Sequence, residues 1–394
     1  MKKKLHVWVV FGTRPEAIKM LPLVLAIKEN PLFKVTVCVT GQHREMLDQV
    51  MDRFGVVADI DLNVMTPGQS LLELSSKISV GLDRALASAE VRPSYILVHG
   101  DTTTTLSASF AAYYHQIPVG HVEAGLRTFD LYSPFPEEGN RKMTGAISAL
   151  HFAPTERARQ ALLNEGVSDS AISVTGNTVV DALKWMVDKI DEQPSLAGKA
   201  LDVVSEIKQR YRHYILITAH RRENHGEGFA RICAALRRIE AANPDVAIIY
   251  PVHPNPNIMG PVRAELGGIE NIKLIEQQEY APFIYLMKNA FMIITDSGGV
   301  QEEAPSLGVP VLVVRDTTER EEAVEVGTVR LVGTDPKKII KEVQTLIDDP
   351  YAYSAMSSKK NPYGDGGACK KIIQALEYDA LKTQTLRTVK DEVE

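Results

Sequence analysis

Short runs of apolar residues alternate along the chain with longer segments in which apolar positions recur with helical periodicity. In the first part of the chain these runs predict strands at Leu5–Phe11, Lys34–Thr40, Tyr95–His99, Pro118–Val122 and Ile172–Val174. The segments between them predict helices at Pro15–Glu29, Arg44–Phe54, Leu71–Ala89, Thr103–His115, Arg141–Ala149 and Glu156–Glu165. Strands that alternate with helices indicate a parallel sheet covered by helices on both faces.

The alternation pauses at a polar, helix-rich stretch from Thr178 to Arg212 and then starts again. The second series predicts strands at Tyr214–Thr218, Val246–Tyr250, Ile272–Ile275, Phe291–Thr295 and Val309–Val314. The chain is therefore expected to be α/β, with two Rossmann-like domains, residues 1–176 and 177–367, whose parallel sheets face each other across a cleft. Residues 368–394 carry an amphipathic helix that is expected to pack back on the first domain. Open α/β sheets bind ligands beyond the carboxyl ends of their strands, so the sequence predicts a site in this cleft.

Composition narrows the class of protein. The 394 residues are 44% hydrophobic and 24% charged, as in an ordinary soluble protein, and the net charge of −6 argues against a nucleic-acid or anionic-membrane partner. Three widely separated cysteines, Cys38, Cys233 and Cys369, indicate neither a disulfide framework nor a zinc site and favour a reducing cytoplasm. The apolar run near the N-terminus is too short for a signal peptide, and no stretch approaches the ~20 residues that span a bilayer.

One strand is followed by Ser297-Gly298-Gly299, which opens a helix. Exposed backbone N–H groups and the helix dipole at such a start can bind an anion, and glycine lets a ligand approach the backbone closely. A carboxylate in the next turn, from Glu302 or Glu303, would suit a vicinal diol such as a ribose. An ordinary N-cap with acidic residues that complement the dipole explains the same pattern equally well.

Polar residues also follow five other predicted strands. They form the segments "GTRPE" after Phe11, "GDTTTT" after His99, "VEAGLR" after His121, "AHRREN" after Thr218 and "PVH" after Tyr250. A surface loop explains any one of these segments. Because all five fall at the sheet edge where ligands bind, together they favour a functional site.

A proline-rich loop, "DLYSPFPEEGNRKMTG", ends in Glu137-Glu138 with Arg141 one turn later. One interpretation is a helix start with an (i, i+4) Glu–Arg pair, worth a few tenths of a kcal/mol. The other is a general base presented on a mobile loop.

Several motifs that would indicate a cofactor are missing from the sequence. There is no G-x-G-x-x-G after a strand and no G-x-x-x-x-G-K-[ST], so neither a nicotinamide cofactor nor a P-loop triphosphate is expected. The histidines are not at metal-ligand spacing, and we expect no cofactor and no catalytic zinc.

The chain carries, in order, the motifs "FGTRPEAIKM", "TGQHREML", "HGDTTTTL", "VGHVEAGLRT", "PFPEEGNR", "TAHRREN", "PVHPNP" and "TDSGGVQEEAPSLGVPVLV". These motifs resemble those of the non-hydrolysing UDP-N-acetylglucosamine 2-epimerases, and the resemblance spans residues 5–380. It implies a GT-B fold, a homodimer, and interconversion of UDP-GlcNAc and UDP-ManNAc in the bacterial cytoplasm, for surface polysaccharide synthesis.

The resemblance also implies roles for individual residues. The catalytic group would be the carboxylates Asp101, Glu123 and Glu137, assisted by Arg141 and His220. The substrate-binding group would be Arg14, Lys19, Gln278, Phe283, Ser297, Gly298, Gly299, Glu303 and Arg320, with the diphosphate at the Ser-Gly-Gly helix start and Glu303 on the ribose. Gln42 and His43 match a regulatory UDP-GlcNAc site of some members, whereas Gly68 stands where those members have arginine.

The chemistry of the sugar agrees with these roles. The C2 hydrogen is not acidic, and without a redox cofactor its inversion requires elimination of UDP across C1–C2 to a 2-acetamidoglucal, followed by re-addition. This route needs cationic groups that stabilise the leaving diphosphate and carboxylates that remove and return the C2 proton. The residues above include candidates for both. A GT-B glycosyltransferase, a hydrolysing epimerase and a non-catalytic UDP-sugar sensor are the alternatives.

Overall fold

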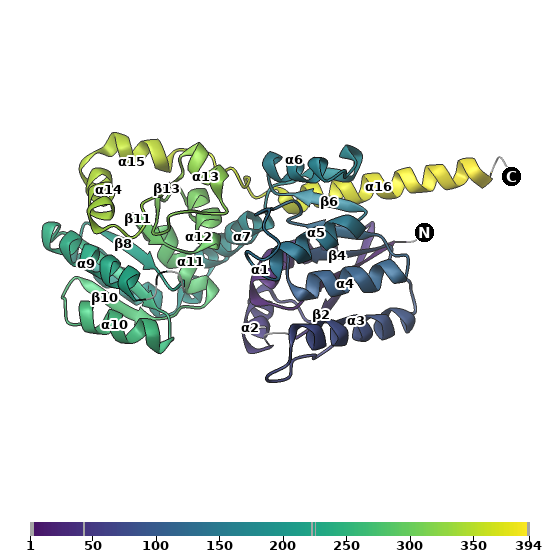
Figure 1. Cartoon of the computed structure of the whole chain (residues 1–394), viewed down its shortest axis with the longest axis horizontal. Helices are drawn as coiled ribbons and strands as arrows, with labels where there is room; N and C mark the ends of the chain where they lie inside the picture. Colours follow the sequence, from purple (N-terminus) through teal and green to yellow (C-terminus); the bar gives the residue numbers. More distant parts are fainter. Residues whose placement is uncertain (1–3, 42–43, 222–223, 225, 392–394) are drawn as a thin grey trace. The chain divides into compact units, whose positions relative to one another are not determined.

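The computed structural model describes residues 4–41, 44–221, 224 and 226–391. The chain forms two compact units, Met1–Ala182 with Tyr363–Glu394, and Leu183–Pro362. It leaves unit 1 within helix α7 (Thr178–Glu192) and returns at residue 363, so unit 2 is inserted between the two parts of unit 1 (Figure 1). These crossings lie a few residues from the predicted boundaries after residues 176 and 367.

Unit 1 is built on a seven-stranded parallel sheet in the order β3-β2-β1-β4-β5-β6-β7. Its strands are β1 (Leu5–Phe11), β2 (Phe33–Val39), β3 (Ile60–Asp61), β4 (Tyr95–His99), β5 (Val119–Val122), β6 (Leu150–Ala153) and β7 (Ile172–Val174). Its helices, besides the first residues of α7, are α1 (Arg14–Glu29), α2 (Arg44–Phe54), α3 (Leu71–Ala87), α4 (Thr103–Tyr114), α5 (Glu137–Ile147), α6 (Glu156–Asn164) and α16 (Ala368–Asp391).

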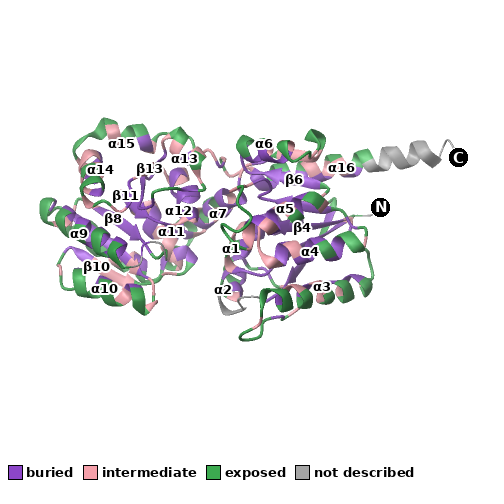
Figure 2. Ribbon diagram, in the orientation of Figure 1, coloured by how far each residue is buried: buried purple, intermediate pink, exposed green. Residues whose placement is uncertain are grey.

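Apolar residues of the sheet pack against helices on both faces of unit 1. On one face, Trp8 and Val10 of β1 form a core with Ile78 of α3 and Ala108 of α4. Elsewhere in the unit, α16 packs beside α1, and its Asp379 accepts a hydrogen bond of 2.6 Å from the Tyr95 hydroxyl. Figure 2 shows the result as buried strands under helices whose outer surfaces are exposed. Within unit 1, the C-terminal helix therefore lies against α1 and β4.

Unit 2 repeats the plan with a six-stranded parallel sheet in the order β10-β9-β8-β11-β12-β13. Its strands are β8 (His213–Thr218), β9 (Val246–Val252), β10 (Ile272–Glu276), β11 (Met292–Thr295), β12 (Val311–Val313) and β13 (Val329–Leu331). Its helices are α8 (Lys199–Arg210), α9 (Glu227–Ala242), α10 (Pro256–Leu266), α11 (Tyr280–Asn289), α12 (Gly298–Glu303), α13 (Glu321–Val326), α14 (Pro336–Asp348) and α15 (Pro350–Ser357).

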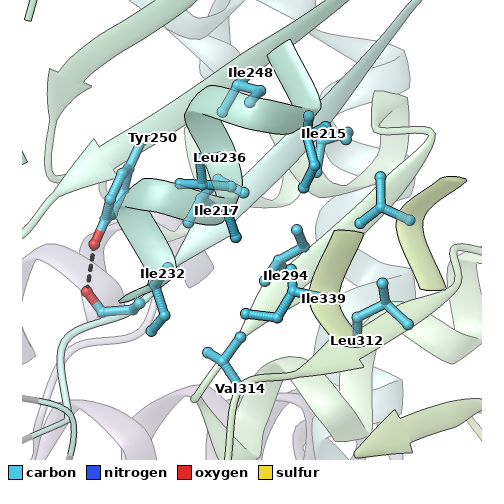
Figure 3. Close-up of a cluster of buried hydrophobic side chains, with 14 of the residues drawn as sticks. Ile215, Ile217, Ile232, Leu236, Ile248, Tyr250, Ile294, Leu312, Val314 and Ile339 are labelled. Carbon is cyan, nitrogen blue, oxygen red and sulfur yellow. Dashed lines mark hydrogen bonds between the residues drawn. The ribbon is translucent and has the colours of Figure 1, made fainter. Parts of the chain in front are cut away.

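The core of unit 2 lies between this sheet and its helices, where Ile217 of β8 and Ile232 of α9 belong to one buried cluster with Ile339 of α14 (Figure 3). Tyr250 stands at the edge of the cluster, and its hydroxyl donates to the carbonyl oxygen of Ala219 at 2.8 Å. This bond fixes the start of the loop after β8 to the neighbouring strand, so the core positions one of the polar segments found in the sequence.

The structure corrects several predicted elements. Strands β3, β6 and β13 were not predicted, because each has only two to four residues and little apolar alternation. Helix α5 begins at Glu137 instead of Arg141, so Glu137 lies in the first turn of a helix and not on a loop. Among the helices that the structure describes, none has the length and apolar character that a membrane crossing requires.

Candidate active site

The loop after β1 is held by a buried carboxylate, Glu16. Glu16 Oε2 accepts hydrogen bonds from the backbone N–H groups of Gly12 (3.1 Å) and Thr13 (2.8 Å), and Oε1 accepts one from the Thr102 hydroxyl (2.7 Å). Burial raises the pKa of Glu16, and these hydrogen bonds oppose the shift. Glu16 therefore ties the loop after β1 to the loop after β4, which bears Asp101. The T-x-x-E pattern of a capping box was its signal in the sequence.

Glu123 follows β5 and is held in place by three groups from elsewhere in unit 1. Oε2 of its carboxylate forms an ion pair with Lys19 of α1, accepts a hydrogen bond from the Asn177 side chain at 2.7 Å, and lies 3.7 Å from His99 Nε2. Its backbone is left-handed, with φ of +64°, a conformation that costs a non-glycine residue about 1–2 kcal/mol. The surrounding contacts stabilise this conformation, which is a common property of residues at functional sites.

Asp101 follows β4 and is fixed through Arg141. Arg141 Nη1 donates to Asp101 Oδ2 at 2.6 Å, and the Asn140 side chain donates to the Asp101 carbonyl oxygen at 2.8 Å. Burial raises the pKa of Asp101; Arg141 opposes this shift, and the negative charges of Glu123 and Glu137 add to it. The three predicted carboxylates are therefore electrostatic neighbours, and Asp101 takes up a proton more readily than an exposed aspartate.

Arg141 is oriented in turn by Glu138, which is fully buried. Glu138 Oε2 accepts from Arg141 Nε (3.0 Å) and from the backbone N–H of Thr128 (3.1 Å), and Oε1 accepts from the N–H of Phe129 (3.1 Å). The Glu–Arg pair considered from the sequence thus exists as an (i, i+3) pair with Glu138, and not as an (i, i+4) pair with Glu137.

Glu137 itself begins α5, and its Oε2 is buried without a hydrogen-bond partner among the described residues. A buried carboxylate oxygen without a hydrogen bond destabilises the fold, and native proteins keep such groups mainly where they have a function. Glu137 is therefore a candidate for substrate contact or proton transfer.

Three buried histidines lie on adjacent strands below these carboxylates: His99, His121 and His151. Burial lowers the pKa of His99 to about 4, that of His121 to about 3 and that of His151 to about 4. They are neutral near pH 7. His121 Nε2 bonds the Gly100 carbonyl oxygen at 2.7 Å and so supports the peptide before Asp101.

In unit 2, His220 follows β8 and is organised by Asp296, which follows β11. Asp296 Oδ2 accepts from the backbone N–H groups of His220 (2.9 Å) and Arg221 (2.8 Å), and Oδ1 lies 3.7 Å from His220 Nδ1. The rings of His220 and His253 stack with centroids 5.6 Å apart. Burial lowers the pKa of His220, while Asp296 opposes the shift. Asp296 is an organising residue to which the sequence analysis gave no role.

The helix start at Ser297 differs from an ordinary N-cap. No hydrogen bond from its side chain caps α12 within the described part of the chain. A Cβ atom at Gly298 would lie 3.3 Å from the guanidinium carbon of Arg320, so glycine lets this cation lie against the helix start. Arg320 is aimed by Glu302, which accepts hydrogen bonds of 2.9 Å from its Nε and Nη2. A cation and backbone N–H groups at one point suit a diphosphate.

The remaining predicted ligands of unit 2 lie around α11. Glu303 is 7% exposed and accepts a hydrogen bond of 3.1 Å from the hydroxyl of Tyr280, the first residue of α11. Phe283, also on α11, is half-buried, and Gln278, in the preceding loop, donates to the Glu276 carbonyl oxygen at 2.6 Å. A nearby pocket of about 420 Å³ is lined by Val252, Pro254, Met259, Arg263, Leu274, Ile275, Glu276 and Gln277, which do not include Gln278 or Phe283.

The structure thus gathers the predicted residues into two constellations, each described within its own unit. Arg14, Lys19, Asp101, Glu123, Glu137 and Arg141 lie in unit 1, and the other described site residues lie in unit 2. Gln42 and His43 lie outside the described residues. Within the described part of the chain, no group of three or more His, Cys, Asp or Glu side chains could hold a metal ion. No role was assigned from the sequence to Glu16, Glu138 or Asn177. Glu138 bonds Arg141 only three residues away, whereas Glu16 also bonds Thr102 and Asn177 bonds Glu123 over 86 and 54 residues.

Comparisons with known proteins agree along nearly the whole chain. The family model described as UDP-N-acetylglucosamine 2-epimerase matches residues 25–377. The chain is 56% identical to the UDP-N-acetylglucosamine 2-epimerase of Escherichia coli strain K12, covering 96% of this chain and 100% of that protein, and 55% identical to that of Salmonella typhimurium, covering 95% and 98%. The crystal structure of the Neisseria meningitidis UDP-GlcNAc 2-epimerase bound to UDP-GlcNAc superposes with a TM-score of 0.86 at 48% identity, covering 95% of this chain and 100% of that one.

These matches, together with the two Rossmann-like units and their parallel sheets, confirm the predicted GT-B fold class. With a family model over residues 25–377 and relatives more than half identical over almost their full length, the chain belongs to the UDP-N-acetylglucosamine 2-epimerase family.

Proposed function

We propose that the protein interconverts UDP-GlcNAc and UDP-ManNAc by inverting C2 of the sugar. The observation that carries the proposal is the carboxylate constellation of unit 1, in which Asp101 is bonded to Arg141 and has Glu123 and Glu137 as charged neighbours. An epimerisation without redox chemistry needs groups that remove a proton from one face of C2 and return one to the other, and positioned carboxylates can do both.

In this proposal the reaction has two steps, an elimination and a re-addition. In the first, a carboxylate takes the C2 proton, the C1–C2 double bond forms, and the C1–O bond to UDP breaks, which yields 2-acetamidoglucal and UDP. In the second, a diphosphate oxygen of UDP re-forms the bond to C1 while a carboxylic acid protonates C2 on the opposite face. Two of the three carboxylates serve these two faces, and Asp101, with its raised pKa, suits the role of acid.

Unit 2 supplies the binding groups for UDP in this proposal. Arg320 and the backbone N–H groups that begin α12 take the diphosphate, and Glu303 takes the ribose hydroxyls. His220 assists near the departing diphosphate, and Gln278 and Phe283 hold the uracil. Arg14 contacts the nucleotide in this proposal. Lys19, to which the resemblance gave the same role, forms an ion pair with Glu123.

The experiment is incubation of the purified protein with UDP-GlcNAc in D₂O, with the products followed by NMR. The proposal requires UDP-ManNAc with deuterium at C2. Free ManNAc and UDP would mark a hydrolysing enzyme, and an unchanged substrate would mark a binding protein. Asp101→Asn, Glu123→Gln and Glu137→Gln should each reduce turnover much more than affinity for UDP, because they remove proton carriers; a parallel loss of UDP affinity would make them ligand contacts.

The family resemblance also leads us to propose a homodimer. Phe110, Tyr113 and Tyr114 of α4 are exposed, and Tyr114 packs against both other rings, with centroids 6.5 and 5.8 Å apart. Aromatic residues are enriched in protein interfaces, and a second copy of the chain is the proposed partner of this face. Sedimentation should give twice the monomer mass for the wild type and the monomer mass for Tyr114→Glu; a monomeric wild type would refute the dimer.

A further inference from the structure

The chain passes between the two units at two places, and both places are anchored in unit 1. The first is α7, which begins at Thr178, and the second is the segment that re-enters at Tyr363. The backbone N–H of Asn177 donates to the Tyr363 carbonyl oxygen at 2.7 Å. The outgoing and returning segments are therefore joined directly, one residue before α7.

Two glycines make this close approach possible. Gly176 has φ of +87° and Gly364 has φ of +112°. A Cβ atom at Gly176 would lie 3.0 Å from the Tyr363 carbonyl oxygen, and one at Gly364 would lie 3.4 Å from the Gly176 Cα atom. Both φ values are ones that L side chains rarely adopt, and a side chain at Gly176 would also press on the Tyr363 carbonyl oxygen, so the contact depends on glycine at these positions.

One turn further along α7, Asp181 strengthens the same junction. Its carboxylate accepts hydrogen bonds from the backbone N–H groups of Ala368 (3.2 Å) and Cys369 (3.0 Å), the first residues of α16. The start of α7 and the start of α16 are therefore held together as one block within unit 1.

Asn177 connects this block to the carboxylate of Glu123. The side chain is 2% exposed; its Oδ1 accepts from the backbone N–H of Val179 at 3.0 Å, and its Nδ2 donates to Glu123 Oε2 at 2.7 Å. The orientation of the amide is determined on both sides, because an N–H group needs the oxygen and a carboxylate needs the nitrogen. An aspartate here could replace the first contact but would repel Glu123.

We propose that Asn177 is a positioning residue that orients the Glu123 carboxylate for proton transfer and fixes it to the junction where the chain leaves and re-enters unit 1. The proposal rests on the proposed function, since Glu123 must carry a proton for its orientation to affect turnover. Asn177 acts through Oε2, the same oxygen that binds Lys19, so its amide and the ammonium group together determine the direction of the carboxylate. A displacement of about 1 Å at a reacting group can cost on the order of 100-fold in rate.

A purely structural role is the competing explanation, because Asn177 also caps α7. Two substitutions separate the roles, since serine and aspartate are both good N-cap residues. Asn177→Ser keeps a cap but its hydroxyl is too short to reach Glu123, and Asn177→Asp keeps a cap but places a negative charge against Glu123. The matched control is Asn243→Ser, a substitution of an equally buried, hydrogen-bonded asparagine in unit 2.

The assay measures kcat, KM and UDP affinity for these variants. Asn177→Ser should lower kcat at least tenfold and leave UDP affinity within twofold, whereas Asn243→Ser should leave kcat within twofold. Asn177→Asp should lower kcat further and move the acidic limb of the kcat/KM profile to higher pH, since a second carboxylate joins Lys19, His99 and Asp101 around Glu123 and raises its pKa. Wild-type kcat in both Asn177 variants would overturn the proposal.

A double-mutant cycle with Glu123→Gln tests the path of the effect. If Asn177 acts through Glu123, Asn177→Ser should change the residual activity of Glu123→Gln less than twofold. An equal tenfold loss in both backgrounds would mean that Asn177 acts through the fold, and would overturn the proposal. The same four proteins are also compared by thermal unfolding, which measures the coupling free energy between Asn177 and Glu123 without any turnover. This measurement distinguishes the absence of the Asn177–Glu123 contact from the absence of the proposed epimerase activity.

Discussion

Substitution of Glu138 by glutamine tests how Arg141 is held. The two oxygens of Glu138 accept from Arg141 and from the backbone N–H groups of Thr128 and Phe129. In Glu138→Gln, the amide NH₂ group must face at least one of these donors, and buried Arg141 keeps Asp101 as its remaining charge partner. The side chain keeps its size, so changes in packing contribute little.

The expected loss of stability follows from these contacts. Breaking a buried ion pair by removing one partner costs about 3–5 kcal/mol, and the retained bond from Arg141 to Asp101 reduces this amount. A lost bond to a backbone N–H adds about 1 kcal/mol. We expect unit 1 to lose about 3 kcal/mol, which corresponds to a fall in Tm of roughly 6–12 °C for a unit of this size. Turnover should fall at least tenfold, because Arg141 keeps its bond to Asp101 but, without Glu138, no longer fixes the orientation of that carboxylate.

Differential scanning calorimetry and steady-state kinetics check this prediction. The matched control is Glu270→Gln, which breaks the exposed ion pair between Arg210 and Glu270 and should change stability by less than about 0.5 kcal/mol. If Glu138→Gln lost no more stability than Glu270→Gln and kept wild-type kcat, Glu138 would not be what orients Arg141.

Three further predictions concern other parts of the protein. Ser297→Ala should weaken UDP affinity about tenfold and leave Tm unchanged, because the Ser297 side chain makes no capping bond. Titration calorimetry measures the affinity for UDP, and an unchanged affinity would remove Ser297 from the diphosphate site. Gly12→Ala should lower the free energy of unfolding, measured in urea, by about 2 kcal/mol, since its Cβ would lie 2.1 Å from the Thr40 hydroxyl. Adding Thr40→Ala should restore part of this loss, and a Gly12→Ala variant with wild-type stability would contradict the close contact. Stability should fall as the pH drops from 6.5 towards 4, because His99, His121 and His151 have lowered pKa values and the unfolded chain binds their protons first; each proton gives a slope of up to about 1.4 kcal/mol per pH unit. His151→Gln should reduce that slope, and a flat profile in urea titrations would refute the prediction.

The sequence predicted the long elements of the fold because their signals are local. Strand β1 and helix α1 have a continuous apolar run, a Thr13 cap and a proline in the first turn, and these patterns need no knowledge of distant residues. Strand β6 has four residues, two of them His151 and Ala153, and it is recognised as a strand only by its pairing with β5 and β7. Short strands of this kind depend on the completed sheet.

The same distinction applies to the candidate site. The placement of Asp101, Glu123 and His220 at the edges of the sheets could be predicted, because each directly follows a strand or lies one residue beyond it. The start of α5 could not be placed, because Glu138 is buried by amides from residues nine and ten positions earlier, across a loop. Asn177 could not be assigned to Glu123, since 54 residues separate them and no periodic pattern records a contact of that range.

The last helix has a consequence for synthesis of the protein on the ribosome. Ile372, Leu376 and Ala380 of α16 are buried in unit 1, and Asn30 donates a hydrogen bond of 2.8 Å to Glu377. The ribosome therefore synthesises every residue of unit 2 before it synthesises α16, the last helix that packs on unit 1. Unit 2 can fold while the earlier part of unit 1 still exposes the apolar residues that α16 covers later, so nascent chains should bind chaperones through the part that was made first.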